Sequence, residues 1–133
     1  MLRFDYRYLP NERGDAVWTE FSAVAAKLLA TSPGVRFIVH PPFIDSSAMD
    51  VPEAASIVGL LGGVCSDNGV DPTPEGVPYG SDATKMVDGG IPTVVFGPGS
   101  IDQAHSRAEF VEIVEVTKAA RMLVQAARQA GRR

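Results

Sequence analysis

The sequence has a single cysteine, Cys65, among its 133 residues. One thiol excludes a disulfide within the chain and any zinc site built mainly from cysteines. Scarce cysteine is typical of a reducing compartment, so we expect a cytoplasmic location. Because Cys65 lies in an apolar stretch, we expect its side chain to be buried and unreactive.

Long apolar runs and an excess of positive charge are also missing. The longest apolar run, residues 54–65, is too short for a membrane span, which needs about 20 residues. The first seven residues carry charges where a signal peptide needs an apolar stretch. The net charge is −4. We therefore expect a soluble chain that binds neither nucleic acid nor a membrane.

The first forty residues show two kinds of hydrophobic periodicity. Residues 2–9 alternate apolar and polar side chains, which predicts a half-buried strand. Residues 15–30 place apolar side chains at helical spacing, which predicts a helix. Residues 35–40 are again rich in β-formers. This order predicts a strand, a helix and a second strand of one sheet.

The remaining residues continue the alternation of helix and strand. We expect a helix from about Val51 to Leu61, a loop over 67–80, and a short helix capped by Ser81 or Asp82 that stops before Gly89. Residues 92–96 are a continuous β-branched run of the kind found in buried parallel strands. A last helix is expected to share one apolar face: Ile113, Val116, Ala120, Leu123, Val124 and Ala127. The fold class is therefore α/β.

Few side chains offer chemistry, and each has a structural alternative. His105 follows the Gly97–Ser100 turn at the expected ligand-binding edge of the sheet. It is either structural or, with Glu109 four residues on, a weak candidate for metal binding. His40 is most simply a surface histidine. The Gly97–Ser100 backbone is either a tight turn or an anion site. Arg7 either clamps a carboxylate or is solvated.

Taken together, several motifs resemble the C-terminal part of the M20 family of zinc amidohydrolases, which includes acetylornithine deacetylase and the glutamate carboxypeptidases. The most specific stretch is the Gly97–Ser100 turn followed by Gln103, Ala104 and His105. The segment at residues 79–83 also resembles the family, as do the Asp5-x-Arg7-x-x-Pro10 pattern and the His40-Pro41-Pro42 sequence.

The resemblance implies a zinc-dependent hydrolase that cleaves the amide bond of an N-acyl amino acid or small peptide. His105 matches the family's C-terminal metal-ligating histidine. Arg7 matches a lid arginine that helps some members hold the substrate carboxylate. The substrate-lining segments of the family match Gly80, Ser81, Gly97 and Gly99. The implied architecture is the C-terminal segment of a zinc-exopeptidase-like α/β catalytic domain (44–133), preceded by a β-α-β half of a ferredoxin-like lid (1–43).

The family's upstream motifs have no match in the chain. There is no HxD metal motif, no Glu-Glu pair with the general base, and no bridging aspartate matching the family's. A catalytic zinc needs three protein ligands and an open position. We therefore expect this chain alone to be inactive.

Three interpretations remain open: a C-terminal piece of an M20 amidohydrolase, a non-catalytic binding or dimerisation module derived from that family, and an unrelated α/β domain. In the first two, a half-lid would leave sheet edges unpaired. We expect a homo-oligomer that associates through residues 1–9 or 35–40.

Overall fold

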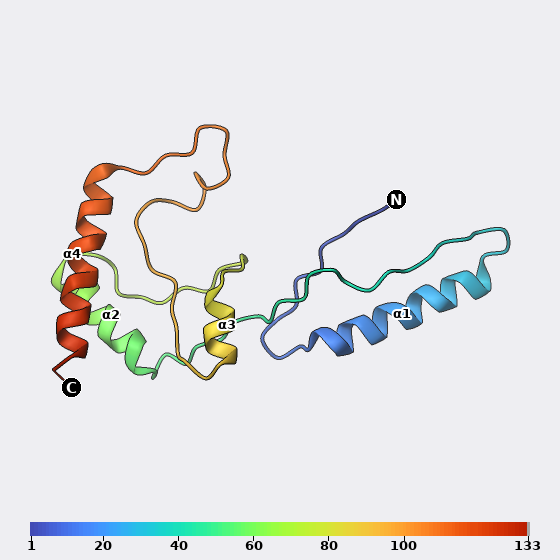
Figure 1. The fold of residues 1–133 in the computed structure, drawn as a ribbon, viewed down its shortest axis with the longest axis horizontal. Coiled ribbons are helices and arrows are strands. Elements are labelled where there is room, and N and C mark those ends of the chain that lie inside the picture. Colours follow the sequence, from blue (N-terminus) through green and yellow to red (C-terminus); the bar gives the residue numbers. More distant parts are fainter. Residues whose placement is uncertain (133) are drawn as a thin grey trace.

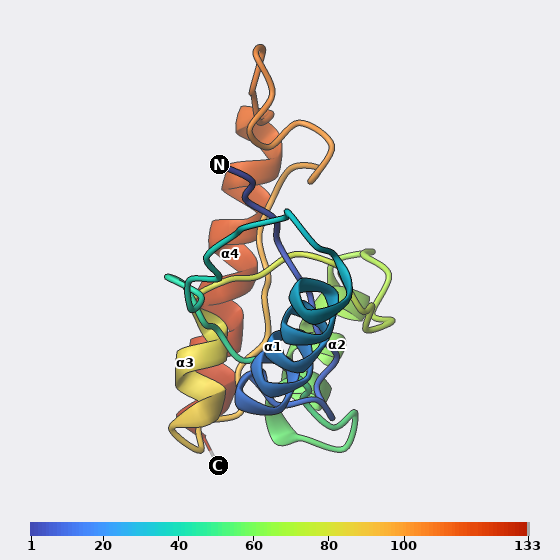
Figure 2. The same cartoon turned by 90° about the vertical axis from the view of Figure 1, so that its right-hand side faces the viewer.

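Four helices, separated by long irregular segments, make up the regular structure of the part described by a computed structural model, residues 1–132. They are α1 (Gly14–Thr31), α2 (Ser56–Asp67), α3 (Ala83–Asp88) and α4 (Ile113–Ala130). Figure 1 shows α1 at one end of the molecule and α2 with α4 at the other. Figure 2, turned by 90°, shows α4 upright behind α1.

The helices predicted at residues 15–30, after Ser81, and in the last segment are confirmed by α1, α3 and α4. The bounds predicted for the remaining helix are wrong, because α2 begins at Ser56 and passes through Gly62 and Gly63 to Asp67. Gly62 and Gly63 each cost about 1 kcal/mol relative to alanine in a helix interior. Burial of Val64 and Cys65 in the next turn offsets that cost.

No strand forms within residues 1–132, so the α/β class and the β-α-β half-lid are not confirmed. The segments predicted as strands, 2–9, 35–40 and 92–96, are irregular, and no backbone hydrogen bond links them to one another. A strand exists only when its N–H and C=O groups pair with a neighbour. Phe4, Ile38 and Val95 accordingly remain more than half exposed.

The buried core lies between α2 and α4. Val64 and Met122 are 0% and 2% exposed, and Cys65 and Ala126 complete the cluster. The expected burial of Cys65 is thus confirmed. Leu61, Val70 and Phe96 pack against the cluster. These two helices are the pair of elements that pack together in the described residues.

A polar link joins the same two helices beside this core. The Asn68 side-chain amide donates to Gln125 Oε1 at 2.9 Å and to the Val64 carbonyl at 2.8 Å. Gln125 Nε2 in turn donates to Asp67 Oδ2 at 2.7 Å. Because the donors and acceptors match at one register only, the link fixes how α4 lies along α2.

The apolar face predicted for α4 is not the buried one. The buried residues are Ala119, Met122 and Ala126, whereas Ile113 is 83% exposed and Leu123 is 52% exposed. Helix α4 has two adjacent apolar stripes, and helical periodicity does not say which stripe a single neighbouring helix covers. Here α2 covers the alanine-rich stripe.

Phe21 of helix α1 contacts an aromatic ring of the segment that precedes the helix. The Phe21 ring lies 5.0 Å from Phe4 and 5.9 Å from Trp18, centroid to centroid. Ala25 is the buried residue of the helix.

The domain boundary between residues 43 and 44 stays a prediction. None of the helices in residues 1–132 has both the length and the apolar character needed to cross a bilayer.

Truncation of the core should destabilise the α2–α4 pair selectively. Met122→Ala removes a 2%-exposed side chain and should lower the free energy of unfolding by about 2–5 kcal/mol. Leu123→Ala, at the half-exposed neighbouring position, is the matched control and should cost far less. Urea unfolding followed by circular dichroism measures both, and equal losses would contradict this core.

Candidate functional site

Arg7 lies against one of the segments predicted to line a substrate site. Its Nη1 donates a hydrogen bond to the carbonyl of Pro78, two residues before Gly80. Its Nε forms an ion pair with Asp5 Oδ2 at 3.0 Å. The side chain is 68% exposed, so most of the guanidinium fork faces solvent. The structure therefore brings Arg7 to the segment that holds Gly80 and Ser81.

Ser81 begins the turn into α3. Its Oγ accepts a hydrogen bond from the N–H of Ala83 at 3.2 Å, and its carbonyl accepts from the buried Thr84 hydroxyl at 3.1 Å. Asp82 pairs with Lys85 at 2.6 Å, which holds the pKa of the Asp82 carboxyl below its usual range. These hydrogen bonds of Ser81 stabilise the start of α3. A Cβ added at Gly80 would meet no atom within 4 Å.

A hydrogen bond between Tyr8 and Asp45 joins the segment before α1 to the segment after it. The Tyr8 hydroxyl donates to Asp45 Oδ1 at 2.7 Å. A hydrogen bond to a carboxylate favours the neutral phenol, and with partial burial it raises the pKa of Tyr8 to about 12. Asp45 also lies at the start of α1, where a Cβ on Gly14 would come within 2.5 Å of its Oδ1. Only glycine fits there without a shift.

The Gly97–Ser100 turn is held by α4. The N–H of Gly99 donates to Glu115 Oε2 at 3.0 Å. Gly99 has φ +88, and an added Cβ would approach Val111 Cγ2 at 3.3 Å. A left-handed φ and a close neighbour both favour glycine at this position. Gly97 lies in open space.

His105 lies on the exposed loop between this turn and α4, drawn in orange in Figure 1. Its φ of 59 is left-handed, which is uncommon outside glycine. Residues 105–109 are not helical, so the spacing of His105 and Glu109 does not place them on one helix face. No hydrogen bond or ion pair in residues 1–132 joins His105 to Arg7 or Ser81.

The side chains present do not form a zinc site by themselves. No group of three His, Cys, Asp or Glu residues that could hold a metal ion occurs within residues 1–132. A catalytic zinc requires three protein ligands. His105 remains one candidate ligand, and the site roles predicted for it and for the substrate-lining residues stay predictions.

Two contacts near these residues could not be predicted from the sequence. Asp45 meets Tyr8 across 37 residues, and Glu115 meets Gly99 across 16. No spacing rule links residues so far apart. The one local signal is an acidic residue in the first turn of a helix, which predicts a favourable helix terminus but not a bond to a turn.

The chain is similar in sequence to a peptidase family and to a deacetylase. A family model described as peptidase family M20/M25/M40 matches residues 10–129. An acetylornithine deacetylase of Myxococcus xanthus is 38% identical over 53 residues. That match spans 40% of this chain but 14% of the relative. No solved structure matches the chain.

The bond between Tyr8 and Asp45 predicts a stability change at high pH. Because the pKa of Tyr8 is about 12 in the folded chain against an ordinary 10.0, its contribution to folding is complete below pH 10 and lost as the pH rises toward 12. Asp45→Asn should lower the pKa of Tyr8, measured by phenolate absorbance. Tyr8→Phe assigns the signal, and an unchanged titration in Asp45→Asn would contradict the bond.

The contact of Glu115 with Gly99 predicts local protection of one amide. Glu115→Ala removes the acceptor, so the Gly99 N–H should exchange faster with solvent in amide-resolved hydrogen exchange. Glu112→Ala, three residues earlier, is the matched control and should leave Gly99 unchanged. Equal exchange rates in all three proteins would show that Glu115 does not hold the turn.

Proposed function

The chain belongs to peptidase family M20/M25/M40, and we propose on that premise that it is part of a zinc-dependent amidohydrolase of the acetylornithine deacetylase type. The observation that carries this proposal is the family match, which spans most of the chain and includes His105. The Myxococcus xanthus relative supports a deacetylase-like branch. The substrate would be an N-acyl amino acid or a small peptide.

In this proposal His105 supplies one ligand to a zinc site whose other ligands lie outside this chain. Three features support that role. The His105 side chain is exposed, its loop follows the glycine turn, and Asp102 and Glu109 lie within four residues of it. Because the described residues include no cluster of three ligands, the chain alone should not hydrolyse an amide.

Substrate binding is assigned in the proposal to Arg7 and to two backbone segments. The free face of the Arg7 guanidinium suits a carboxylate, which it would bind through two parallel N–H donors. The segment of Gly80 and Ser81 already lies beside Arg7 through Pro78. The turn of Gly97 and Gly99 has open space on the Gly97 side, where a substrate could approach the backbone.

A second candidate function is a non-catalytic binding or dimerisation module derived from the same family. It is favoured by the exposed apolar residues of the irregular segments, among them Phe4, Ile38 and Phe43. Large exposed apolar side chains gathered in one region mark interaction surfaces. Residues 1–9 and 35–40 would then pair with a second copy.

Zinc titration of the two histidines tests the proposed ligand role. Added Zn²⁺ should shift the ring NMR signals of His105 at lower concentration than those of His40, because carboxylates lie close to His105 in sequence and none lies within four residues of His40. His105→Ala assigns the signals.

The outcome separates the two functions. Preferential zinc binding at His105 supports a chain that keeps its part of a hydrolase site. Identical zinc dependence of both histidines would overturn the ligand role and favour the non-catalytic module.

A further inference from the structure

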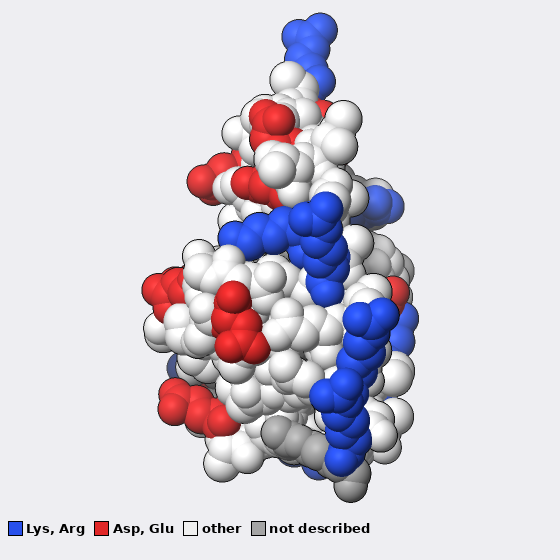
Figure 3. Space-filling model, turned by 90° about the vertical axis from the view of Figure 1, so that its left-hand side faces the viewer, with Lys and Arg blue, Asp and Glu red and all other residues white. Residues whose placement is uncertain are grey.

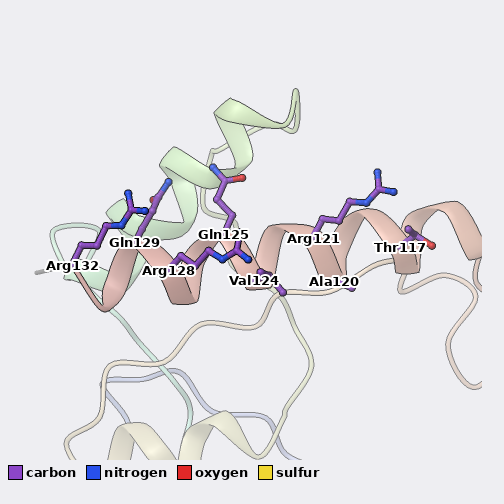
Figure 4. A pocket seen from close by; sticks show the side chains of 8 residues that line it. All are labelled: Thr117, Ala120, Arg121, Val124, Gln125, Arg128, Gln129 and Arg132. Atoms are coloured by element: carbon purple, nitrogen blue, oxygen red, sulfur yellow. The ribbon is translucent and has the colours of Figure 1, made fainter.

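The outward side of α4 carries a shallow groove that neither candidate function uses. Its volume is about 650 Å³. All but the last of its lining residues belong to α4, as Figure 4 shows. The lining residues are Thr117, Ala120, Arg121, Val124, Gln125, Arg128, Gln129 and Arg132.

The groove is positively charged over an apolar floor. Arg121, Arg128 and Arg132 form no ion pair within residues 1–132. No acidic residue follows Glu115 in the sequence. Figure 3, which views the molecule from its α4 end, shows Lys and Arg side chains running along this face. Val124, 51% exposed, lies between the charges.

The same chain contains a segment of opposite charge. Residues 37–84 contain seven Asp or Glu residues and no Lys or Arg. Within them, residues 71–77 are exposed throughout and include Asp71, Glu75 and two prolines. Thr73 hydrogen-bonds to Asp71 and holds the pKa of that carboxyl below its usual range, so the charge persists at neutral pH. Proline stiffens such a segment and reduces the entropy lost on binding.

The spacing of charges in the groove and the segment agrees. Seven residues of helix separate Arg121 from Arg128, which is about 10 Å along α4. Four residues of extended, proline-rich chain separate Asp71 from Glu75, which is about 12 Å. Val124 lies between these two arginines, as Pro72 and Pro74 lie between the two carboxylates, so the prolines can cover the apolar floor at Val124.

We propose that residues 71–77 of a second copy of this chain lie in the α4 groove, with Asp71 and Glu75 facing Arg121 and Arg128. The segment of the same chain starts beside α2, where Pro72 lies near Gly62, and it does not line the groove. A net charge of −4 disfavours nucleic acid or anionic lipid as the occupant. Reciprocal exchange of the two segments closes a symmetric dimer.

Sedimentation velocity of the whole chain at two salt concentrations tests the contact. The chain should dimerise at about 0.02 M salt and dissociate at about 0.5 M, because exposed charge pairs are screened. Arg121→Glu with Arg128→Glu should weaken dimerisation roughly tenfold or more. Asp71→Lys with Glu75→Lys should do the same.

Mixing the two variants tests the contact most directly. Each variant alone should dimerise more weakly than the unchanged chain, and the mixture should form a heterodimer because each groove then faces a segment of opposite charge. Lys27→Glu with Arg36→Glu, on and beside α1, is the control and should leave dimerisation unchanged. Circular dichroism confirms that α4 remains helical in each variant.

Two results would overturn the proposal. One is a chain that stays monomeric at low salt at every accessible concentration. The other is association that survives both high salt and the groove substitutions, which would assign self-association to residues 1–9 or 35–40 instead. The proposal stands or falls independently of zinc binding at His105, because neither the groove nor the segment contains that residue.

Discussion

The packing of α2 against α4 is the interaction on which the rest of the structure depends. Val64 and Met122 are nearly completely buried there, and they are the two fully buried large apolar side chains of the described residues. The link through Asn68 and Gln125 fixes the register of the two helices. Glu115 extends that order from α4 to the Gly99 turn. The position of the glycine turn therefore follows from a core that lies elsewhere.

Local sequence signals predict the helices and fail for the strands. A helix satisfies its backbone within one segment, so the periodicity of residues 15–30 was sufficient to predict α1. A strand needs a neighbour, and residues 2–9 and 35–40 make no ladder within residues 1–132. Residues 92–96 likewise form no ladder with another segment within residues 1–132. Helix α2 continues beyond the predicted end because tertiary burial of Val64 outweighs the cost of Gly62 and Gly63.

Local sequence signals likewise reveal the residues of the candidate site but not the contacts between them. Its individual residues are visible in the sequence: His105 after a glycine turn, and Ser81 at the start of a helix. The pairing of Arg7 with the Pro78 carbonyl is a contact across 71 residues, which no local pattern encodes. The same holds for Tyr8 and Asp45. The chemistry of these residues is therefore a proposal that rests on the family match.

Zinc content per chain in the protein purified at neutral pH tests the central claim, that this chain holds one part of a hydrolase site and needs further ligands. Because no group of three candidate ligands occurs within residues 1–132, the account predicts well below one zinc per chain, and the same value in His105→Ala. One tightly held zinc per chain that is lost in His105→Ala would contradict it, because the site would then be complete in this protein.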